Sequence, residues 1–386
     1  MSEDREDVIK VLKAAIGEHY VLTDDHSLEF YSMDVYRSFE IPIAIVQPGN
    51  IGELQETVRI ASGLGVSIVT RGGGASYTDA YLPTDPNSII IDTSRLNKIV
   101  EINEEDMFVT VEAGVTWAEM AATLAEKNLR TPFWGPFSGL KATIGGSTSQ
   151  NSVSMGSGIY GGSAESILCY EVVLANGQMI KTGSSSMENS SQFFRNYGPD
   201  LTGIFSGDAG ALGVKAKITM RLIKLPSHTL TCSFGFKNYN SMSQGMAAVA
   251  REQSISSNWG LDPKLQRGQL GKVTFMDSIR AAFAVLKTAR NPLEAIIQLI
   301  KMALAGKRFL TGFDYSAHFV AEGYSTAEVK SKLAQTRKVI SPFGTEIANT
   351  IPTVMGAMPF MPLHPILGPQ GERWVPMHGL LPFSKM

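Results

Sequence analysis

The chain has 386 residues, of which 44% are hydrophobic and 18% charged, and its formal net charge is −2. That length predicts two or three domains, each large enough to bury a core. The near-neutral charge excludes the basic surface expected of a nucleic-acid-binding protein, and no block of like charges indicates an interaction tail. The two cysteines, Cys169 and Cys232, have no metal-ligand spacing, so we expect no metal site, no disulfide framework and a reducing, cytoplasmic setting.

Two segments bear on targeting and membranes. Residues 1–17 are acidic and amphipathic and have neither the basic nor the apolar region of a signal peptide. Residues 292–309 form the most apolar helical stretch, but Glu294 and Lys301 interrupt it and it is too short to span a bilayer. A buried amphipathic helix is the favoured interpretation of this stretch, and a helix lying on a membrane surface is the alternative.

The chain begins with helices that alternate with short strands. A helix is expected at about residues 4–16, and the apolar run 41–46 predicts a buried strand. The helix that follows places Leu54, Val58 and Ala61 on one face, and glycines end it.

Strands then dominate up to the middle of the chain. Residues 88–115 predict two or three strands, and the next helix is capped by Thr116 with Glu119 three residues on. Residues 131–166 are rich in Ser and Gly and have little periodicity, yet their apolar residues favour an ordered, functional loop. An Asn176–Gly177 turn predicts a hairpin after it.

The pattern changes after Pro226, and we place a domain boundary near Leu225. A strand at 229–239 is followed by helical patterns to about residue 308, then by a strand at 313–323 and a helix at 325–340. The remaining tail is rich in Pro, Met and Gly. The whole pattern predicts an α+β protein with two domains.

Three consecutive glycines, Gly72–Gly74, follow the β-branched strand 67–71. Glycine runs are expected where something approaches the main chain closely. The run lacks the spacing and following helix of a dinucleotide-binding motif, and no Gly-Lys-Ser/Thr ending marks a Walker A loop. Consecutive backbone N–H groups can instead form an anion-binding concavity, to which Arg71 and Ser76 would add donors.

Two further glycine turns, at residues 142–151 and 206–214, offer the same chemistry. Three such turns in one α+β domain favour an extended cofactor contacted by several loops. The alternative is that they are ordinary hairpin and bulge glycines, among the 37 glycines of the chain.

These motifs, taken in order, resemble the FAD-binding domain of the vanillyl-alcohol oxidase and p-cresol methylhydroxylase type (PCMH type). That superfamily also contains the D-lactate dehydrogenase and glycolate oxidase flavoproteins. The resemblance rests on the run from the glycine loop through "ATIGGS" and "EVVLANG" to "GDAGALGV", and it covers about residues 40–225. It implies two α+β subdomains that hold FAD (residues 1–225) and a cap domain that holds substrate (residues 226–386), with a cap that looks incomplete at its C-terminus.

The resemblance also implies site positions. Arg71–Ser76 match the pyrophosphate loop, Thr143–Gly146 match a second cradle with the residues after it toward the flavin, and Gly207–Val214 match a third loop near the adenine and ribose end. The cofactor-binding residues implied are Arg71, Gly72, Gly73, Gly74, Ala75, Ser76, Thr143, Ile144, Gly145, Gly146, Ser149, Asn151, Ser154, Gly207, Gly213 and Val214.

Departures from the family pattern bear on how the flavin is attached and on which active-site groups are present. Ala75 stands where some relatives carry a histidine that bonds to the flavin, so the flavin is expected to be noncovalent; His378 in the cap is the alternative attachment point. Ser154 or Met155 matches a flavin-facing position that is an Asp in some phenol-oxidising relatives, so an acid is missing there. The histidine-rich metal motif of the 2-hydroxy-acid branch is also not seen, and no metal is expected.

Oxidation of an alcohol by flavin needs a base for the hydroxyl proton, and a carboxylate substrate suits an arginine. The cap offers His318, His364 and His378, and we select His378 and Arg373, in "ERWVPMHG", as the catalytic candidates. For each single residue the alternative is a structural role.

We therefore expect an FAD-dependent oxidoreductase that takes a hydride from a small alcohol, with a 2-hydroxy acid such as lactate or glycolate favoured. The alternatives are an oxidase or hydroxylase of para-substituted phenols or aryl alcohols, a flavin-binding but catalytically incomplete subunit, and an NADPH-using reductase. Oxygen, a quinone or a cytochrome subunit are the open electron acceptors. A homo-oligomer or heteromer is expected, without nucleic acid.

Overall fold

The computed structural model describes residues 3–34, 37–270, 279, 282–286, 296, 299–300, 312–360 and 382–385. The chain divides into two compact units. Unit 1 comprises residues 1–153 and 162–224, and unit 2 comprises residues 154–161 and 225–386. Helices and strands occur in both units, so the α+β class expected from the sequence is confirmed.

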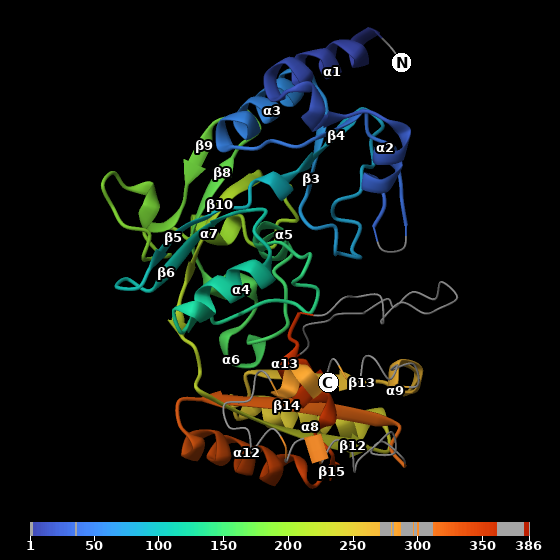
Figure 1. The fold of residues 1–386 in the computed structure, drawn as a ribbon, viewed down its shortest axis with the longest axis vertical. Coiled ribbons are helices and arrows are strands. Elements are labelled where there is room, and N and C mark those ends of the chain that lie inside the picture. The colour runs from blue at the N-terminus through green and yellow to red at the C-terminus, as the bar shows by residue number, and fades with distance from the viewer. Residues whose placement is uncertain are drawn as a thin grey trace. The chain divides into compact units, whose positions relative to one another are not determined.

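The N-terminal part of unit 1 is a four-stranded sheet covered by helices. Its strands, in spatial order, are β1 (Val21–Leu22), β2 (Ala44–Val46), β4 (Ser88–Asp92) and β3 (Ser67–Arg71). β2, β4 and β3 are parallel, and all of β4 is buried, as expected for a strand covered on both faces. Helices α1 (Glu3–Ile16) and α3 (Ile51–Gly63) lie side by side (Figure 1). The face of α3 predicted from Leu54, Val58 and Ala61 is buried, which confirms that prediction.

The second part of unit 1 is an antiparallel five-stranded sheet. Its strands, in spatial order, are β5 (Ile99–Asn103), β6 (Phe108–Glu112), β10 (Val214–Arg221), β8 (Ile167–Val173) and β9 (Met179–Lys181). β8 and β9 form the predicted hairpin, and Gly177 in its turn has a φ of +79°. The Gln55 Nε2 of α3 donates to the Gly177 carbonyl at 2.9 Å, so α3 also contacts this second sheet.

Shorter elements of unit 1 connect these sheets, and two of them carry predicted features. The capping box of Thr116 and Glu119 is present at the start of α4, and the Ser/Gly-rich segment 131–166 is ordered and contains three short helices. The shorter elements are η1 (Glu18–Tyr20), α2 (Asp25–Tyr31), η2 (Thr93–Arg95), α4 (Trp117–Glu126), β7 (Leu129–Arg130), α5 (Ile144–Ser149), η3 (Ser163–Ser166), η4 (Gly183–Ser186), α7 (Leu201–Ile204) and β11 (Ile223–Lys224).

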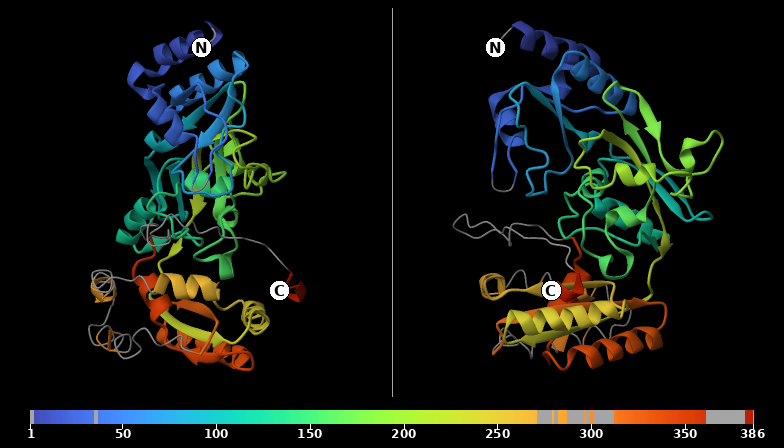
Figure 2. Two further views of the ribbon diagram at one scale, coloured as in Figure 1. Left: turned by 90° about the vertical axis from the view of Figure 1, so that its right-hand side faces the viewer. Right: turned by 180° about the vertical axis from the view of Figure 1, so that it is seen from behind.

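Unit 2 is an antiparallel sheet with helices against it (Figure 2). The strands, in spatial order, are β13 (Ser257–Leu261), β14 (Tyr315–Gly323), β12 (His228–Phe236) and β15 (Thr345–Ile347). The helices are α6 (Ser157–Tyr160), α8 (Tyr239–Arg251), α9 (Pro263–Leu270), α12 (Thr326–Ile340), α13 (Thr350–Ala357) and η7 (Phe383–Lys385). β14 confirms the strand predicted at 313–323, and α12 confirms the helix predicted at 325–340.

The two faces of the unit 2 sheet differ in chemistry. Phe234, Phe236 and Phe319 alternate along β12 and β14 and form the apolar core with α8 and α12. The intervening residues, among them Ser233 and His318, lie on the other face. Among the described residues, no helix is long and apolar enough to cross a membrane.

Candidate functional site

The glycine loop that follows β3 presents a row of backbone N–H groups. The Tyr81 hydroxyl donates to the carbonyl oxygens of Gly74 and Ser76, at 3.0 and 2.9 Å, and so fixes the orientation of the peptide groups between them. Within the described part of the chain, the N–H groups of Gly73, Gly74, Ala75 and Ser76 have no hydrogen-bond acceptor. Gly74 has a φ of +61°, which gives the loop the left-handed turn of an anion-binding concavity.

The glycines of this loop are required by a neighbouring loop as well. A Cβ atom on Gly73 would overlap the backbone carbonyl oxygen of Lys141, and a Cβ on Gly72 would overlap Oγ1 of Thr143. The bare main chain therefore lets two loops approach each other closely. Any substitution at Gly73 displaces Lys141 whether or not a cofactor is bound.

The second predicted cradle, at the start of α5, is a packing junction. Thr143 caps the helix, and its Oγ1 accepts from the Gly146 N–H at 3.2 Å. The Gly145 N–H donates to the Ala113 carbonyl at 2.9 Å, and Ile144 is fully buried. The N–H groups of both glycines therefore already have acceptors. The segment contacts the glycine loop through Thr143, whose Oγ1 lies against Gly72.

The third predicted loop contacts α5 of the second cradle and β3, the strand that leads into the glycine loop. The N–H groups of Gly207 and Ala209 donate to the Thr148 and Ser149 carbonyls of α5, at 2.9 and 2.8 Å. Gly207, Ala209 and Gly210 all have positive φ, and a Cβ on Gly210 would overlap Thr70 of β3.

Gly213 and Val214 lie at the far end of this loop. They pack against Val172 and Val173 of β8, on the side of the sheet core. The structure thus brings together the three loops around α5, while these two residues contribute to the sheet.

The sequence reasoning missed a buried ion pair beneath the third loop. Lys215 Nζ lies 2.6 Å from Asp208 Oδ1, and each side chain is only 2% exposed. Burial lowers the pKa of Lys215, although Asp208 opposes the shift. The Gly210 N–H also donates to Asp208 Oδ1, at 2.9 Å, so the pair holds the turn between Asp208 and Gly210.

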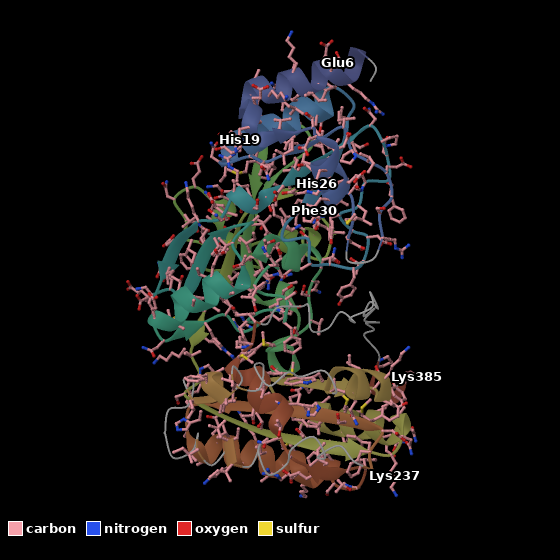
Figure 3. All side chains as sticks on the ribbon, turned by 45° about the vertical axis from the view of Figure 1, so that its right-hand side comes forward. Glu6, His19, His26, Phe30, Lys237 and Lys385 are labelled. Atoms are coloured by element: carbon pink, nitrogen blue, oxygen red, sulfur yellow. The ribbon has the colours of Figure 1, made fainter. Side chains whose placement is uncertain are left out.

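Arg71 has partners within its own unit. Its Nη1 donates to the carbonyls of Tyr31 and Met33, at 3.0 and 3.1 Å. Its guanidinium lies over the rings of Phe30, Tyr31 and Tyr81 (Phe30 is labelled in Figure 3). Arg71 therefore ties α2 and its following loop to the glycine loop. Tyr81, buried beside it, has its pKa raised by desolvation to about 12.

Of the three histidines selected from the sequence, His318 is the one that the structure describes, and it lies in unit 2. Its Nδ1 lies 2.8 Å from Ser233 Oγ and its Nε2 lies 3.1 Å from Ser316 Oγ. Ser316 donates onward to Gln266 Oε1 at 2.9 Å, so its oxygen accepts from His318 Nε2–H. The side chain is fully buried, and desolvation lowers the pKa of His318 to about 3. This neutral, saturated imidazole is a structural residue and a poor base.

The remaining predicted residues fall elsewhere. Ser154 belongs to unit 2, where its N–H donates to Ser157 Oγ at 2.9 Å. Arg373, His378 and His364 lie outside the described residues. Among the residues that the structure does describe, no cluster of His, Cys, Asp or Glu is arranged to hold a metal ion.

The arrangement in unit 1 suits FAD. Four consecutive N–H groups that have no acceptor in the described part of the chain match the oxygens of a pyrophosphate, and no Cβ projects from the three glycines before Ala75. Thr78 Oγ1 lies 2.9 Å from Ser76 Oγ and donates to Gln150 Oε1 at 3.0 Å, so a polar edge runs from the glycine loop to the end of α5. The residues present therefore fit an extended dinucleotide.

Comparisons with known proteins agree with this arrangement. Residues 42–183 match the FAD binding domain family. The glycolate oxidase subunit GlcD of Bacillus subtilis (strain 168) is 30% identical over 226 residues, which are 58% of this chain and 46% of that protein. The mitochondrial D-lactate dehydrogenase [cytochrome] of Arabidopsis thaliana is 30% identical over 234 residues, 59% of this chain and 39% of that protein.

A third relative and a solved structure extend the comparison. The D-2-hydroxyglutarate dehydrogenase of Stutzerimonas stutzeri (strain A1501) is 28% identical over 236 residues, 61% of this chain and 49% of that protein. The crystal structure of p-cresol methylhydroxylase with substrate bound has a TM-score of 0.73 at 20% identity and covers 93% of this chain and 70% of that one. The matches to these curated relatives span less than half of each relative's length.

Residues 42–183, within unit 1, thus match the FAD binding domain family, and the fold of the chain is similar to that of p-cresol methylhydroxylase.

Proposed function

We propose that this protein is a flavin-dependent oxidoreductase that oxidises the CH–OH group of a small 2-hydroxy acid. The observation that carries the proposal is the row of backbone N–H groups at Gly73–Ser76, which have no acceptor among the described residues. The substrate class is supported by the relatives, since glycolate, D-lactate and D-2-hydroxyglutarate all carry a hydroxyl next to a carboxylate.

The cofactor would be held noncovalently by unit 1. The N–H groups of Gly73 to Ser76 would bind the pyrophosphate, and the turn at Gly207–Gly210 would contact the adenosine end. Ala75 offers no side chain for a covalent bond to flavin. FAD, when bound, supplies a two-electron acceptor for the substrate.

The substrate would be held by the domain at 226–386. Arg373 would bind the substrate carboxylate through its planar fork, and His378 would accept the hydroxyl proton. The neutral, buried His318 favours this choice, because a group with a pKa of about 3 takes up little charge near neutral pH. Oxygen, a quinone and a cytochrome subunit all stay open as electron acceptors.

The test is spectroscopic. The purified protein would be mixed with FAD, freed of excess cofactor and examined by visible absorption before and after acid precipitation. We expect flavin absorbance that moves to the acid supernatant. We then expect anaerobic glycolate, D-lactate or D-2-hydroxyglutarate to bleach it, and p-cresol and vanillyl alcohol to leave it unchanged.

Each other outcome corrects one part of the proposal. Colour that stays with the pellet would show a covalent link and point to His378. Bleaching by the phenols alone would replace the substrate class. A bound flavin that no substrate bleaches would indicate a catalytically incomplete subunit. Failure to bind FAD at all would overturn the function itself.

A further inference from the structure

The loop after α2 is folded back on itself and bonded to the end of β3. Met33 and Ser38 form an antiparallel bridge. Between them, the Asp34 N–H donates to the Arg37 carbonyl at 2.9 Å, and the Arg37 N–H donates to Asp34 Oδ1 at 2.9 Å. The Met33 carbonyl accepts from Arg71 Nη1 at 3.1 Å. The backbone at Arg37 is therefore fixed relative to the strand that precedes the glycines.

The Arg37 guanidinium forms an ion pair with a carboxylate on the other side of the glycine loop in the sequence. Its Nε lies 2.9 Å from Asp79 Oδ1, and the two side chains are 46% and 29% exposed. That carboxylate oxygen is buried and accepts no hydrogen bond within the described part of the chain, so Arg37 offsets its charge by electrostatic attraction. The Glu40 N–H donates to the Pro83 carbonyl at 3.0 Å, which joins the same two stretches of chain a second time.

Asp79 begins the turn that carries Tyr81. Its φ is +60°, a left-handed backbone that aspartate tolerates better than most residues with a side chain. The Leu82 N–H donates to the Asp79 carbonyl at 3.0 Å and closes a four-residue turn with Tyr81 at its third position. The position of Asp79 therefore determines where the phenol of Tyr81 lies.

Tyr81 in turn sets the direction of the N–H row. Its hydroxyl donates to the Gly74 carbonyl, and in a planar trans peptide the N–H of the following residue points the opposite way. The Ala75 N–H is thus turned away from Tyr81, to a side on which it meets no acceptor in the described part of the chain. Tyr81 is buried, and its ring centroid lies 4.8 Å from Arg71 Cζ, so its ring has little freedom of its own.

We propose that Arg37 and Asp79 are positioning residues for the pyrophosphate of FAD, because their ion pair holds Tyr81 against the glycine loop and so keeps the N–H row in its binding orientation. The inference rests on the proposed binding of FAD by unit 1. Neither side chain contacts the cofactor; each acts through Tyr81. The pair slows the release of FAD more than it speeds binding, since most changes at a preformed site appear in the dissociation rate.

The use of the arginines in this region leads to a second consequence. A cation beside a phosphate site commonly bonds to the anion directly. Arg71 instead donates to the carbonyls of Tyr31 and Met33, and Arg37 is paired with Asp79. Both arginines thus hold protein groups, and the pyrophosphate is left to uncharged N–H groups. FAD release should therefore depend on salt chiefly through the Arg37–Asp79 pair, which salt screens.

The first test measures the dissociation rate, koff, of FAD and of ADP, which carries the same pyrophosphate. Arg37→Gln removes the cation, and we expect koff for both ligands to rise about threefold to fivefold, as for the loss of a half-exposed ion pair, with kon changed by less than about twofold. Asp79→Asn, which suits the left-handed backbone and removes the charge, should have the same effect. Arg37→Lys keeps the charge and should restore most of the wild-type rate.

A double-mutant cycle tests the path through Tyr81. Tyr81→Phe removes the hydroxyl that orients the glycine loop, and we expect koff to rise about tenfold. In that background Arg37→Gln should add nothing, because its effect passes through the hydroxyl. The matched control is Arg337→Gln, which removes an ion pair of unit 2 whose side chains are 45% and 43% exposed and should leave koff unchanged.

A wild-type koff in Arg37→Gln would overturn the positioning role, and effects that add to those of Tyr81→Phe would overturn the path through Tyr81. A wild-type protein that binds neither FAD nor ADP would instead refute the proposed function. If Arg37→Gln does not fold, salt supplies the test: raising NaCl from about 0.05 M to about 0.5 M should increase koff of the wild type and leave that of Asp79→Asn unaltered. An equal response of both proteins would overturn the inference.

Discussion

Protonation of a single imidazole in unit 2 is opposed by its surroundings. In the chain from Ser233 through His318 to Ser316 and Gln266, each hydrogen has one acceptor when the ring is neutral. A second proton on the ring would require the Ser233 hydroxyl to stop donating, and it would place a charge in a fully buried site. The burial of that charge lowers the pKa of His318 to about 3.

The stability of unit 2 should therefore depend on pH through His318. Because the folded-state pKa lies below the ordinary value of 6.5, the unfolded chain binds a proton that the folded chain does not, and the free energy of unfolding falls as pH decreases from 6.5 toward 3. The expected slope is at most about 1.4 kcal/mol per pH unit. Urea unfolding at pH 7 and pH 4.5 should show wild type losing about 2–3 kcal/mol more than His318→Gln. Equal losses would contradict the assignment.

The buried pair of Asp208 and Lys215 should respond to loss of one partner. Lys215→Met leaves the Asp208 carboxylate buried without a cation, and we expect unit 1 to lose about 3–5 kcal/mol in urea unfolding at pH 7. The control is Lys127→Met, since Lys127 and Glu104 are 42% and 55% exposed and such pairs contribute little. A Lys215 variant as stable as this control would show that the pair is not a structural tie.

At the scale of elements, the contact between the glycine loop and the loop before α5 can be separated from cofactor binding. Gly73→Ala places a Cβ against the Lys141 carbonyl, so we expect the unfolding free energy of the FAD-free protein to fall by about 2 kcal/mol. Gly63→Ala, at the end of α3 with no atom within 4 Å of the new Cβ, should be neutral or slightly stabilising. If the FAD-free Gly73→Ala variant has the same unfolding free energy as wild type, Gly73 is required only for ligand binding.

Several elements follow from local signals in the sequence, and others do not. The Thr116 capping box, the Asn176–Gly177 hairpin and the helix after Ser325 are each fixed by a few adjacent residues. The Asp208–Lys215 pair depends on a turn that folds back on its own strand, and neighbouring sequence carries no sign of that burial.

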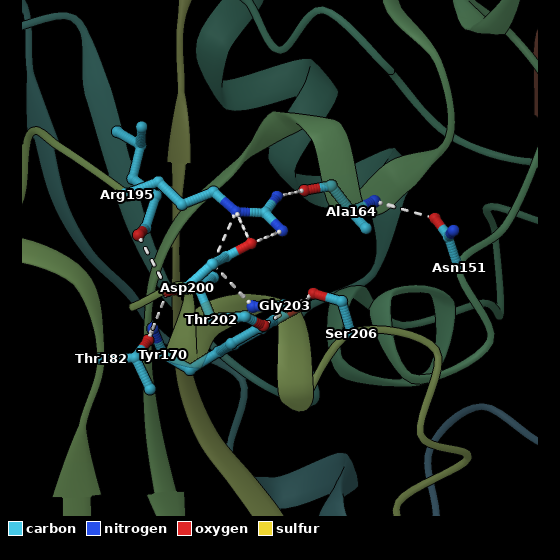
Figure 4. Close-up of polar contacts among 10 residues, drawn as sticks. Asn151, Ala164, Tyr170, Thr182, Arg195, Asp200, Thr202, Gly203 and Ser206 are labelled. Carbon is cyan, nitrogen blue, oxygen red and sulfur yellow. Dashed lines mark hydrogen bonds and ion pairs between the residues drawn. The ribbon is translucent and has the colours of Figure 1, made fainter. Parts of the chain in front are cut away.

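The candidate site also combines features that adjacent residues predict with contacts that only the fold supplies. The glycine loop is visible as a motif, whereas the Arg195–Ala164–Asn151 link, in which the backbone of Ala164 bonds to both side chains (Figure 4), joins three segments that are separate in the sequence. Sequence also could not show that Gly73 is crowded by Lys141, because that contact is made between two loops.

At the scale of the whole molecule, the chain crosses between the units three times, after residues 153, 161 and 224. Segment 154–161 therefore belongs to unit 2 although both of its flanks belong to unit 1. The Gly156 N–H donates to Ser257 Oγ at 3.0 Å and the Gly158 N–H donates to the Ser256 carbonyl at 2.9 Å. The domain division at residue 225 that the sequence suggests omits this segment, because nothing in its composition distinguishes it from the loop around it.

This organisation leads to a prediction about how FAD stabilises the protein. If the cofactor binds unit 1 alone, it should raise the unfolding midpoint of unit 1, by about 2.7 kcal/mol at 100 times Kd, and leave that of unit 2 unchanged. Trp117, fully buried in unit 1, and Trp259 on β13 of unit 2 report on the two units separately in single-tryptophan variants. Urea titrations with and without FAD should move the Trp117 transition only. An equal shift of both would show that the two units unfold together, because stabilisation of one would then be shared by the other.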